Sequence, residues 1–210
     1  MKRKIVTKLM AIVLAGVLLT GSVTPGFHMS RVQAAEDLFN TRYDFNFEDG
    51  IEGWYYGEGW EYQYNGAKPT LESDTENGRM KIAVDFSQDA DKNWSNIAAC
   101  WKSEEGIDLS GVTQISMDIW YETEKLTEGE LKLAFYSNCG IDVNTSLIDV
   151  QEEEGTGLTK ARAVFGFPAI GSDAVTDLAV KIVGCNTGYS GAVWIDNIQF
   201  EAKDSETGDE

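Results

Sequence analysis

The sequence has little histidine and little cysteine, and both shortages limit the chemistry that it can support. Its 210 residues contain one histidine, His28, and three cysteines, Cys100, Cys139 and Cys185. His28 lies in a segment that we expect to be removed, so the mature chain would hold neither a Ser-His-Asp or Cys-His catalytic site nor a histidine-ligated zinc site. Three cysteines leave at least one unpaired or paired with another chain, and we expect small buried thiols.

Basic residues are also scarce, and several of them open the chain. Four stand within its first eight residues: Lys2, Arg3, Lys4 and Lys8. The twelve-residue apolar run Leu9–Thr20 follows, and Val32-Gln33-Ala34 provides a small-residue cleavage site. A membrane-spanning helix needs about 20 apolar residues. We therefore predict that residues 1–35 are a secretory signal peptide and that the mature protein is extracellular.

The remaining sequence is strongly acidic. Residues 1–35 hold five of the 17 basic residues and none of the 35 acidic ones, which leaves 12 bases against 35 acids and a formal charge near −23. Such a charge repels nucleic acid, anionic lipid and acidic polysaccharides such as pectin. Neutral ligands and cations are the partners that this composition allows.

Long helical periodicity is absent after residue 35, and short alternating runs between glycine-rich turns take its place. The clearest runs are 43–47, 80–86, 115–121, 131–136, 161–165, 178–183 and 192–200. About nine strands at this spacing predict an all-β fold, a sandwich of two antiparallel sheets, over residues 37–202. The polar residues 203–210 are expected to form an acidic, linker-like tail that leads to further domains of a parent protein.

Aromatic residues exceed what such a core needs, with six tryptophans and eight tyrosines. Trp54 and Trp60 stand among glycines in a loop after the first strand, which suits a binding rim better than a core. Trp94 directly precedes a strand. Trp120 and Tyr136 are predicted to share the outward face of two adjacent strands. The alternative for each tryptophan is that it caps a sheet edge or fills a corner.

These five side chains indicate a sugar-binding surface. A hexose has an apolar C–H face that stacks on an aromatic ring at low entropic cost, and its hydroxyl groups bond to nearby polar side chains. We therefore predict that Trp54, Trp60, Trp94, Trp120 and Tyr136 bind a neutral polysaccharide.

Two groups of acidic residues are candidates for other chemistry. Glu48, after the first strand, and Asp196, in the last, would meet if those strands pair, and their oxygen atoms suit a structural Ca²⁺. The stretch from Glu72 to Glu76 has the E-x-D-x-E spacing of one class of retaining β-glucanase. Asn77-Gly78 follows at once, so we expect these acids to lie in a turn, which is a poor position for catalysis.

Three segments occur in an order that resembles that of β-jelly-roll carbohydrate-binding modules. They are Phe-Glu-Asp-Gly (47–50) with Gly53-Trp54, Ile-Asp-Leu-Ser-Gly-Val (107–112), and Trp-Ile-Asp-Asn-Ile-Gln-Phe (194–200). The chain is most similar to the mannan-binding families 27 and 23, which accompany bacterial β-mannanases. This resemblance covers most of residues 43–201.

The resemblance implies binding of β-1,4-mannan, galactomannan or glucomannan in a concave groove, and a structural calcium ion. Trp54 matches the tryptophan after the opening glycine. Glu48 and Asp196 match the calcium-binding acids of the opening and closing strands, whereas Trp94 and Trp120 match by approximate position.

The leading hypothesis is a non-catalytic module that targets an attached glycoside hydrolase, such as a β-mannanase, to mannan. The alternatives are a module of the same fold that binds β-glucan or xylan, a small carboxylate-based glycosidase, and a structural or cell-surface interaction module.

Overall fold

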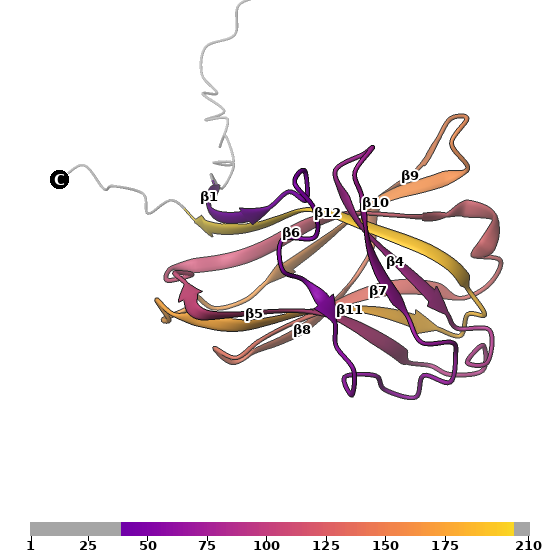
Figure 1. The fold of residues 1–210 in the computed structure, drawn as a ribbon, viewed down its shortest axis with the longest axis horizontal. Helices are drawn as coiled ribbons and strands as arrows, with labels where there is room; N and C mark the ends of the chain where they lie inside the picture. The colour runs from indigo at the N-terminus through magenta and orange to yellow at the C-terminus, as the bar shows by residue number, and fades with distance from the viewer. Residues whose placement is uncertain (1–38, 204–210) are drawn as a thin grey trace, which may run out of the picture. The chain divides into compact units, whose positions relative to one another are not determined.

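The computed structural model describes residues 39–203. These residues form two antiparallel β-sheets that face each other (Figure 1). The predicted signal peptide, and all but the first residue of the predicted tail, lie outside the described residues. The expected all-β sandwich is confirmed.

The first sheet has seven strands. They are β1 (Phe39–Phe45), β3 (Thr70–Asp74), β4 (Arg79–Asp85), β6 (Val112–Glu122), β9 (Ile148–Glu153), β10 (Leu158–Gly166) and β12 (Ser190–Lys203). The order is β3-β4-β12-β6-β10-β9, and β1 also pairs with β12. One edge of β12 therefore pairs first with β4 and then with β1, while its other edge pairs with β6.

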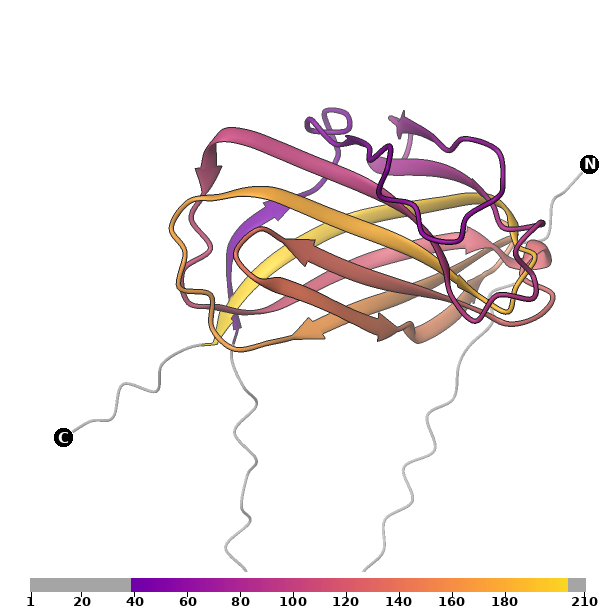
Figure 2. The same ribbon diagram turned by 90° about the horizontal axis from the view of Figure 1, so that it is seen from below.

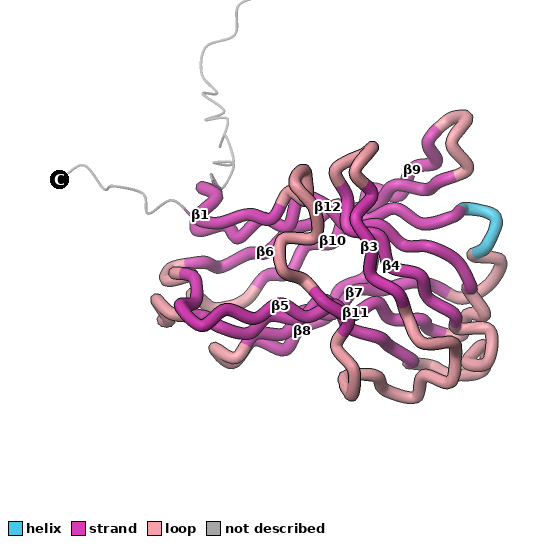
Figure 3. The backbone as a smooth tube through the Cα atoms, in the orientation of Figure 1, coloured by secondary structure: helices cyan, strands magenta, loops and turns pink. Residues whose placement is uncertain are grey.

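The second sheet has five strands in the order β2-β5-β11-β7-β8. They are β2 (Tyr55–Tyr56), β5 (Ser95–Ile107), β7 (Glu130–Ser137), β8 (Ile141–Ser146) and β11 (Val175–Cys185). This sheet comes to the front when the molecule is seen from below (Figure 2). The 3₁₀ turn η1 (Thr123–Lys125) stands out among strands and loops (Figure 3). No helix within residues 39–203 is long and apolar enough to cross a membrane.

The core lies between the sheets and follows the alternation of strand side chains. Met80, Ile82 and Val84 of β4 point inward, as do Leu131, Leu133 and Phe135 of β7. Each predicted run overlaps a strand, but the structure adds strands such as β8 and β9 that the sequence pattern did not reveal. These two lie at sheet edges and carry mostly polar residues, so they lack a strong apolar alternation.

The acidic stretch with glucanase-like spacing is only partly in a turn. Glu72 and Asp74 belong to β3, contrary to expectation, and Glu76 lies in the turn to β4. Glu72 forms an ion pair with Lys81 at 3.6 Å, and both oxygens of Asp74 accept hydrogen bonds from Asn77. These acids are therefore occupied by local partners on an exposed sheet edge.

Candidate functional site

The outward face of the five-stranded sheet carries a floor of small, buried side chains. They form two patches: Ala98, Cys100 and Ala179, and Ala134, Val183 and Cys185. Outward-facing side chains are buried only if something covers them. Tyr136 packs on the first patch and Trp94 on the second. Burial raises the pKa of the Cys100 thiol to about 11, so this thiol remains protonated and unreactive at neutral pH.

Trp60 lies over the same floor. Its ring meets that of Tyr136 edge to face, with centroids 4.9 Å apart, and 39% of the residue is exposed. Gly57 allows this close approach, because a Cβ there would come within 2.4 Å of Cys100 Sγ and 3.4 Å of Trp60 Cγ. Trp60 therefore presents part of a large apolar ring to solvent beside Tyr136.

Polar side chains stand between and around these rings. Asn96 accepts a hydrogen bond from Trp94 Nε1 at 3.0 Å and donates one to the Trp60 carbonyl at 3.2 Å. Lys181 Nζ lies 5.8 Å from the centre of the Trp60 ring and 6.0 Å from that of Tyr136. Asp142 pairs with Lys181 at 3.8 Å. Hydrogen-bonding groups and aromatic faces thus share one surface.

The rings form a row along the sheet. Trp94 packs on the patch that contains Val183, and Tyr136 on the patch that contains Ala179; both of those residues belong to β11. Four residues of a strand span about 13 Å. A row of this length, with aromatic rings and polar groups together, is suited to several consecutive units of a sugar chain.

Trp60, Trp94 and Tyr136 are the predicted residues that the structure brings together. Sequence reasoning missed Asn96 and Lys181. Lys181 could have been found, because it interrupts the apolar run 178–183 at an outward position. The role of Asn96 depends on two rings that the chain delivers from separate loops.

Trp54 is not part of this surface, and its assignment to a binding rim was wrong. Only 1% of the residue is exposed, and its ring packs edge to face against Phe45 at 5.2 Å and Phe47 at 6.5 Å. Gly50 and Gly53, both at positive φ, turn the chain so that Trp54 enters the core. Glycines beside an aromatic residue indicate a turn, and a turn can direct its side chain inward.

Trp120 lies on the opposite side of the sandwich from Tyr136, so the prediction that they share adjacent strands was also wrong. Trp120 belongs to β6 of the seven-stranded sheet, and Tyr136 to β7 of the other. Only 3% of Trp120 is exposed. The Arg79 guanidinium lies 3.7 Å from its ring centre and Lys160 Nζ 4.8 Å away, while its Nε1 donates to Glu153. Its ring is therefore covered by the protein's own cations.

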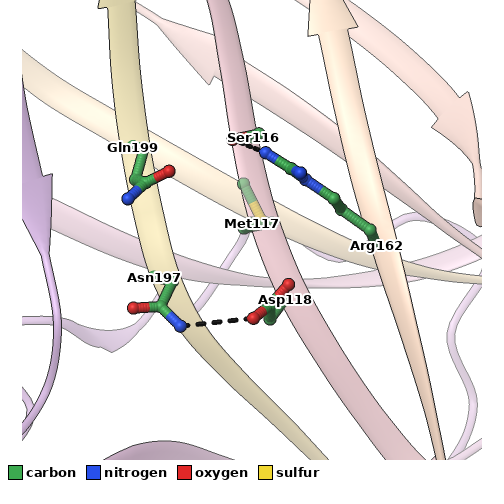
Figure 4. Close-up of a pocket in the computed structure, with 6 residues that line it drawn as sticks. All are labelled: Ser116, Met117, Asp118, Arg162, Asn197 and Gln199. Carbon is green, nitrogen blue, oxygen red and sulfur yellow. Dashed lines mark hydrogen bonds between the residues drawn. The ribbon is translucent and has the colours of Figure 1, made fainter. Parts of the chain in front are cut away.

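The same outer face holds a small polar pocket of about 260 Å³ between β12, β6 and β10 (Figure 4). It forms where the pairing of β12 with β6 shifts register. Arg162 reaches across to donate to Ser116 Oγ at 3.0 Å, and Asn197 donates to Asp118 at 3.2 Å. No aromatic ring lines this pocket, so it lacks the stacking surface of the other face.

Of the predicted calcium ligands, Glu48 follows β1 and Asp196 lies within β12. β1 and β12 pair as expected, with Phe45 opposite Ile198. Glu48 packs beside Gly78. The next residue after Gly78 is Arg79, and its positive charge acts on the Asp196 carboxyl. Burial raises the pKa of Asp196, and the negative charge of Asp118 raises it further.

Among residues 39–203, no three His, Cys, Asp or Glu side chains are grouped to hold a metal. A cation at Glu48 and Asp196 would also need backbone carbonyl ligands, which Ca²⁺ accepts.

A two-sheet β-sandwich with partly exposed aromatic rings on one outer face is an arrangement found in carbohydrate-binding modules. A family model described as carbohydrate binding module 27 matches residues 32–203, and the chain belongs to this family. Membership identifies it as a binding module rather than a catalytic domain. A comparison with curated proteins gave no match.

Solved structures share the fold. One, described as a study of specific mannan recognition by the module TmCBM27, is 17% identical with a TM-score of 0.60, and the match covers 80% of this chain and 99% of that one. CBM27-1 of Caldicellulosiruptor saccharolyticus, in complex with mannohexaose, is 17% identical with a TM-score of 0.60 over 78% and 98%. A CBM28 module described as specific for non-crystalline cellulose is 16% identical with a TM-score of 0.55 over 75% and 92%.

Proposed function

We propose that this chain binds β-1,4-mannan, including galactomannan and glucomannan, on the outer face of its five-stranded sheet. The observation that carries the proposal is the row of partly exposed rings of Trp94, Trp60 and Tyr136 above a floor of small side chains. Family membership supports a carbohydrate ligand. The two CBM27 structures named for mannan and mannohexaose support mannan as that carbohydrate.

The binding energy follows from the chemistry of the face. The exposed part of the Trp60 ring, with Tyr136 and Trp94 beside it, offers apolar surface for the C–H face of a hexose, and Lys181 and Asp142 offer groups for its hydroxyls. Two or three stacked rings at ~1–1.5 kcal/mol each, with a few hydrogen bonds, give roughly micromolar to sub-millimolar affinity.

Affinity electrophoresis in galactomannan, glucomannan, xylan and β-glucan gels, with calorimetry on mannohexaose, tests the proposal. Trp60→Ala and Tyr136→Ala should each weaken mannan binding about tenfold, which corresponds to ~1.4 kcal/mol. Trp120→Ala is the control, because its ring lies on the other face, and it should bind as the unmodified chain does. If all variants bind mannan equally, the outer face of the five-stranded sheet is not the binding site. If only xylan or β-glucan gels retard the chain, mannan is not its ligand.

We further propose that the module is secreted and directs an attached glycoside hydrolase to its substrate. The signal-like residues 1–35 and the linker-like residues 203–210 support this proposal. The isolated chain should release no reducing sugar from mannan. A purely binding role would be contradicted if the purified chain released reducing sugar and substitution of one of its carboxylates abolished that release.

Calcium is a separate proposal, with Glu48 and Asp196 among its ligands. The raised pKa of Asp196 means that ionising this carboxyl, above its ordinary value of 3.8, costs stability in the folded chain without a cation. A bound Ca²⁺ would offset that cost and add RT ln(1 + [Ca²⁺]/Kd), about 2.7 kcal/mol at 100 times Kd.

Thermal unfolding with calcium and with a chelator tests this proposal. Calcium should raise the Tm of the unmodified chain at pH 7 but not that of Asp196→Asn. In chelator, Asp196→Asn should be more stable than the unmodified chain at pH 7 and lose this advantage near pH 3. Asp74→Asn, at the acidic residue that ends β3, is the control. A Tm that does not respond to calcium would refute the site.

A further inference from the structure

Trp194 of β12 lines a pocket of about 540 Å³ on the seven-stranded sheet. The wall continues through Leu158 of β10, Glu122 of β6, the η1 turn and the turn between β9 and β10. Trp194 points to the outer face, because its neighbours Val193 and Ile195 are both buried in the core.

We propose that this pocket is a second carbohydrate site, on the opposite side of the sandwich from the first, and that it takes hexose units of a separate polysaccharide chain. The module then joins two chains as well as binding one. The inference rests on the proposed binding of mannan to the outer face of the five-stranded sheet.

Trp194 is open to a ligand where its neighbour is covered. It stands opposite Trp120 in the pairing of β12 with β6. The ring of Trp120 lies under Arg79 and Lys160, and its Nε1 donates to Glu153. Within residues 39–203, by contrast, no cation lies over the half-buried Trp194 ring and no group accepts from its Nε1. This indole therefore offers both a flat face and a donor to the pocket.

The lining has the mixed chemistry that a hexose requires. Trp194 and Leu158 give apolar surface for its C–H face. Glu122 and Glu124 provide acceptors for hydroxyl groups, and Lys125 provides donors. Two carboxylates and one ammonium group leave a net negative charge, which disfavours an anionic ligand. A cationic ligand meets Lys125 in the same space, whereas a neutral sugar bonds to both kinds of group.

The pocket wall is held in place before any ligand arrives. The Thr123 amide donates to the Gly157 carbonyl at 3.0 Å, which ties η1 to the turn between β9 and β10. The hydroxyls of Thr123 and Thr159 lie 2.8 Å apart. Glu122 Oε2 accepts from the Ala192 amide at 2.8 Å, which fixes this carboxylate beside β12. Preformed walls of this kind reduce the entropy lost on binding.

The position of the pocket determines what a second site can do. The sheets of a sandwich pack ~10 Å apart, so a sugar chain on one outer face must pass around an end of the molecule to reach the other. A polysaccharide offers the same unit many times on many separate chains, which favours engagement of a weak second site. The pocket therefore engages another chain.

Nuclear magnetic resonance on the full chain tests the site directly. The Trp194 indole N–H signal, assigned from its loss in Trp194→Phe, should shift as mannohexaose is added beyond saturation of the first face. Lys125→Ala, at an exposed lining residue, should raise the mannohexaose concentration at half-shift about three- to tenfold, as expected for a lost hydrogen bond to a charged group. The control is Val150→Ala, at an exposed apolar residue of the same sheet outside this pocket, which should change nothing.

Light scattering tests the joining of chains. The unmodified chain should raise the scattering of a galactomannan solution, and Trp194→Ala should lower this rise about fivefold or more while mannohexaose affinity at the first face stays within about twofold. If Trp194→Ala scatters as strongly as the unmodified chain, the pocket does not join chains.

A Trp194 signal that ignores mannohexaose, or that shifts with spermidine instead, would show that the pocket is not a sugar site and would leave the first face intact. Failure of the unmodified chain to bind mannohexaose at all overturns the proposed function and this inference together. The two failures are therefore distinguishable.

Discussion

Asn96 is the residue on which two of the three exposed rings depend. Only 4% of it is exposed, and its side-chain amide uses its oxygen for Trp94 Nε1 and its nitrogen for the Trp60 carbonyl. Its backbone also pairs with Tyr62 in both directions. Asn96 therefore fixes the position of a ring at the start of β5 relative to a ring in the turn after β2.

We predict that Asn96→Ala weakens mannan binding about tenfold although Asn96 lies beneath the rings. The substitution leaves the Trp94 indole N–H and the Trp60 carbonyl without this partner, which also costs roughly 1–3 kcal/mol of unfolding free energy. Calorimetry and denaturant unfolding measure the two effects. Asn77→Ala, at an exposed turn, is the control. Full affinity in a destabilised Asn96→Ala chain would show that the rings hold their positions without the amide.

At the scale of elements, residues 57–69 cross from β2 in one sheet to β3 in the other, and they position Trp60 over the outer face. Asp89 anchors this segment, with 1% of the residue exposed. Its carboxylate accepts from the Asn65 backbone amide at 3.1 Å, the Asn65 side chain at 2.6 Å and Ser95 Oγ at 3.0 Å. The segment thus has little regular structure of its own but is fixed by a buried carboxylate.

We expect Asp89→Asn to loosen the segment more than the sheets. The amide presents its own N–H groups where donors already point, so hydrogen bonds are lost and the penalty is about 1–3 kcal/mol. Hydrogen exchange should rise in residues 57–69 while β6, β11 and β12 remain protected. Mannan affinity should also fall, because the loosened segment carries Trp60. Unchanged exchange in the segment would exclude Asp89 as its anchor.

The whole molecule carries a large negative charge while its proposed ligand carries none. The full sequence has a formal charge of −18, but the charges on the five-stranded sheet include opposite-sign pairs, such as Lys181–Asp142 and Lys102–Asp177. Association with a neutral chain releases no counterions, and screening changes little about stacking or short hydrogen bonds.

Mannohexaose affinity should therefore change less than about twofold between 50 and 500 mM salt, because no ionic contact is formed with the ligand. Isothermal calorimetry at several salt concentrations measures this. Salt could also act on the Lys181–Asp142 ion pair, and the Lys181→Ala variant, which lacks this pair, measures that contribution. A steep fall in affinity with salt would indicate an ionic ligand and contradict the proposed neutral polysaccharide.

The sequence by itself determined the fold class and the kind of ligand. Alternating apolar residues in runs such as 80–86 and 115–121 predict strands with one buried face. In the structure these runs form β4 and β6, whose apolar residues are buried. The excess of acidic over basic residues disfavours nucleic acid and other anionic partners without reference to geometry. The surplus of aromatic residues indicated a sugar, and Trp60, Trp94 and Tyr136 were among the residues named for it.

Only the tertiary structure decided which of the five rings lie together on one outer face of the sandwich. Trp54 and Trp60 stand in the same glycine-rich stretch, yet turns direct one into the core and the other onto the sheet. Trp120 and Tyr136 follow one another in consecutive strands, yet those strands belong to opposite sheets. Alternation specifies that a side chain points outward, but strand pairing over long sequence distances determines which side of the sandwich that is.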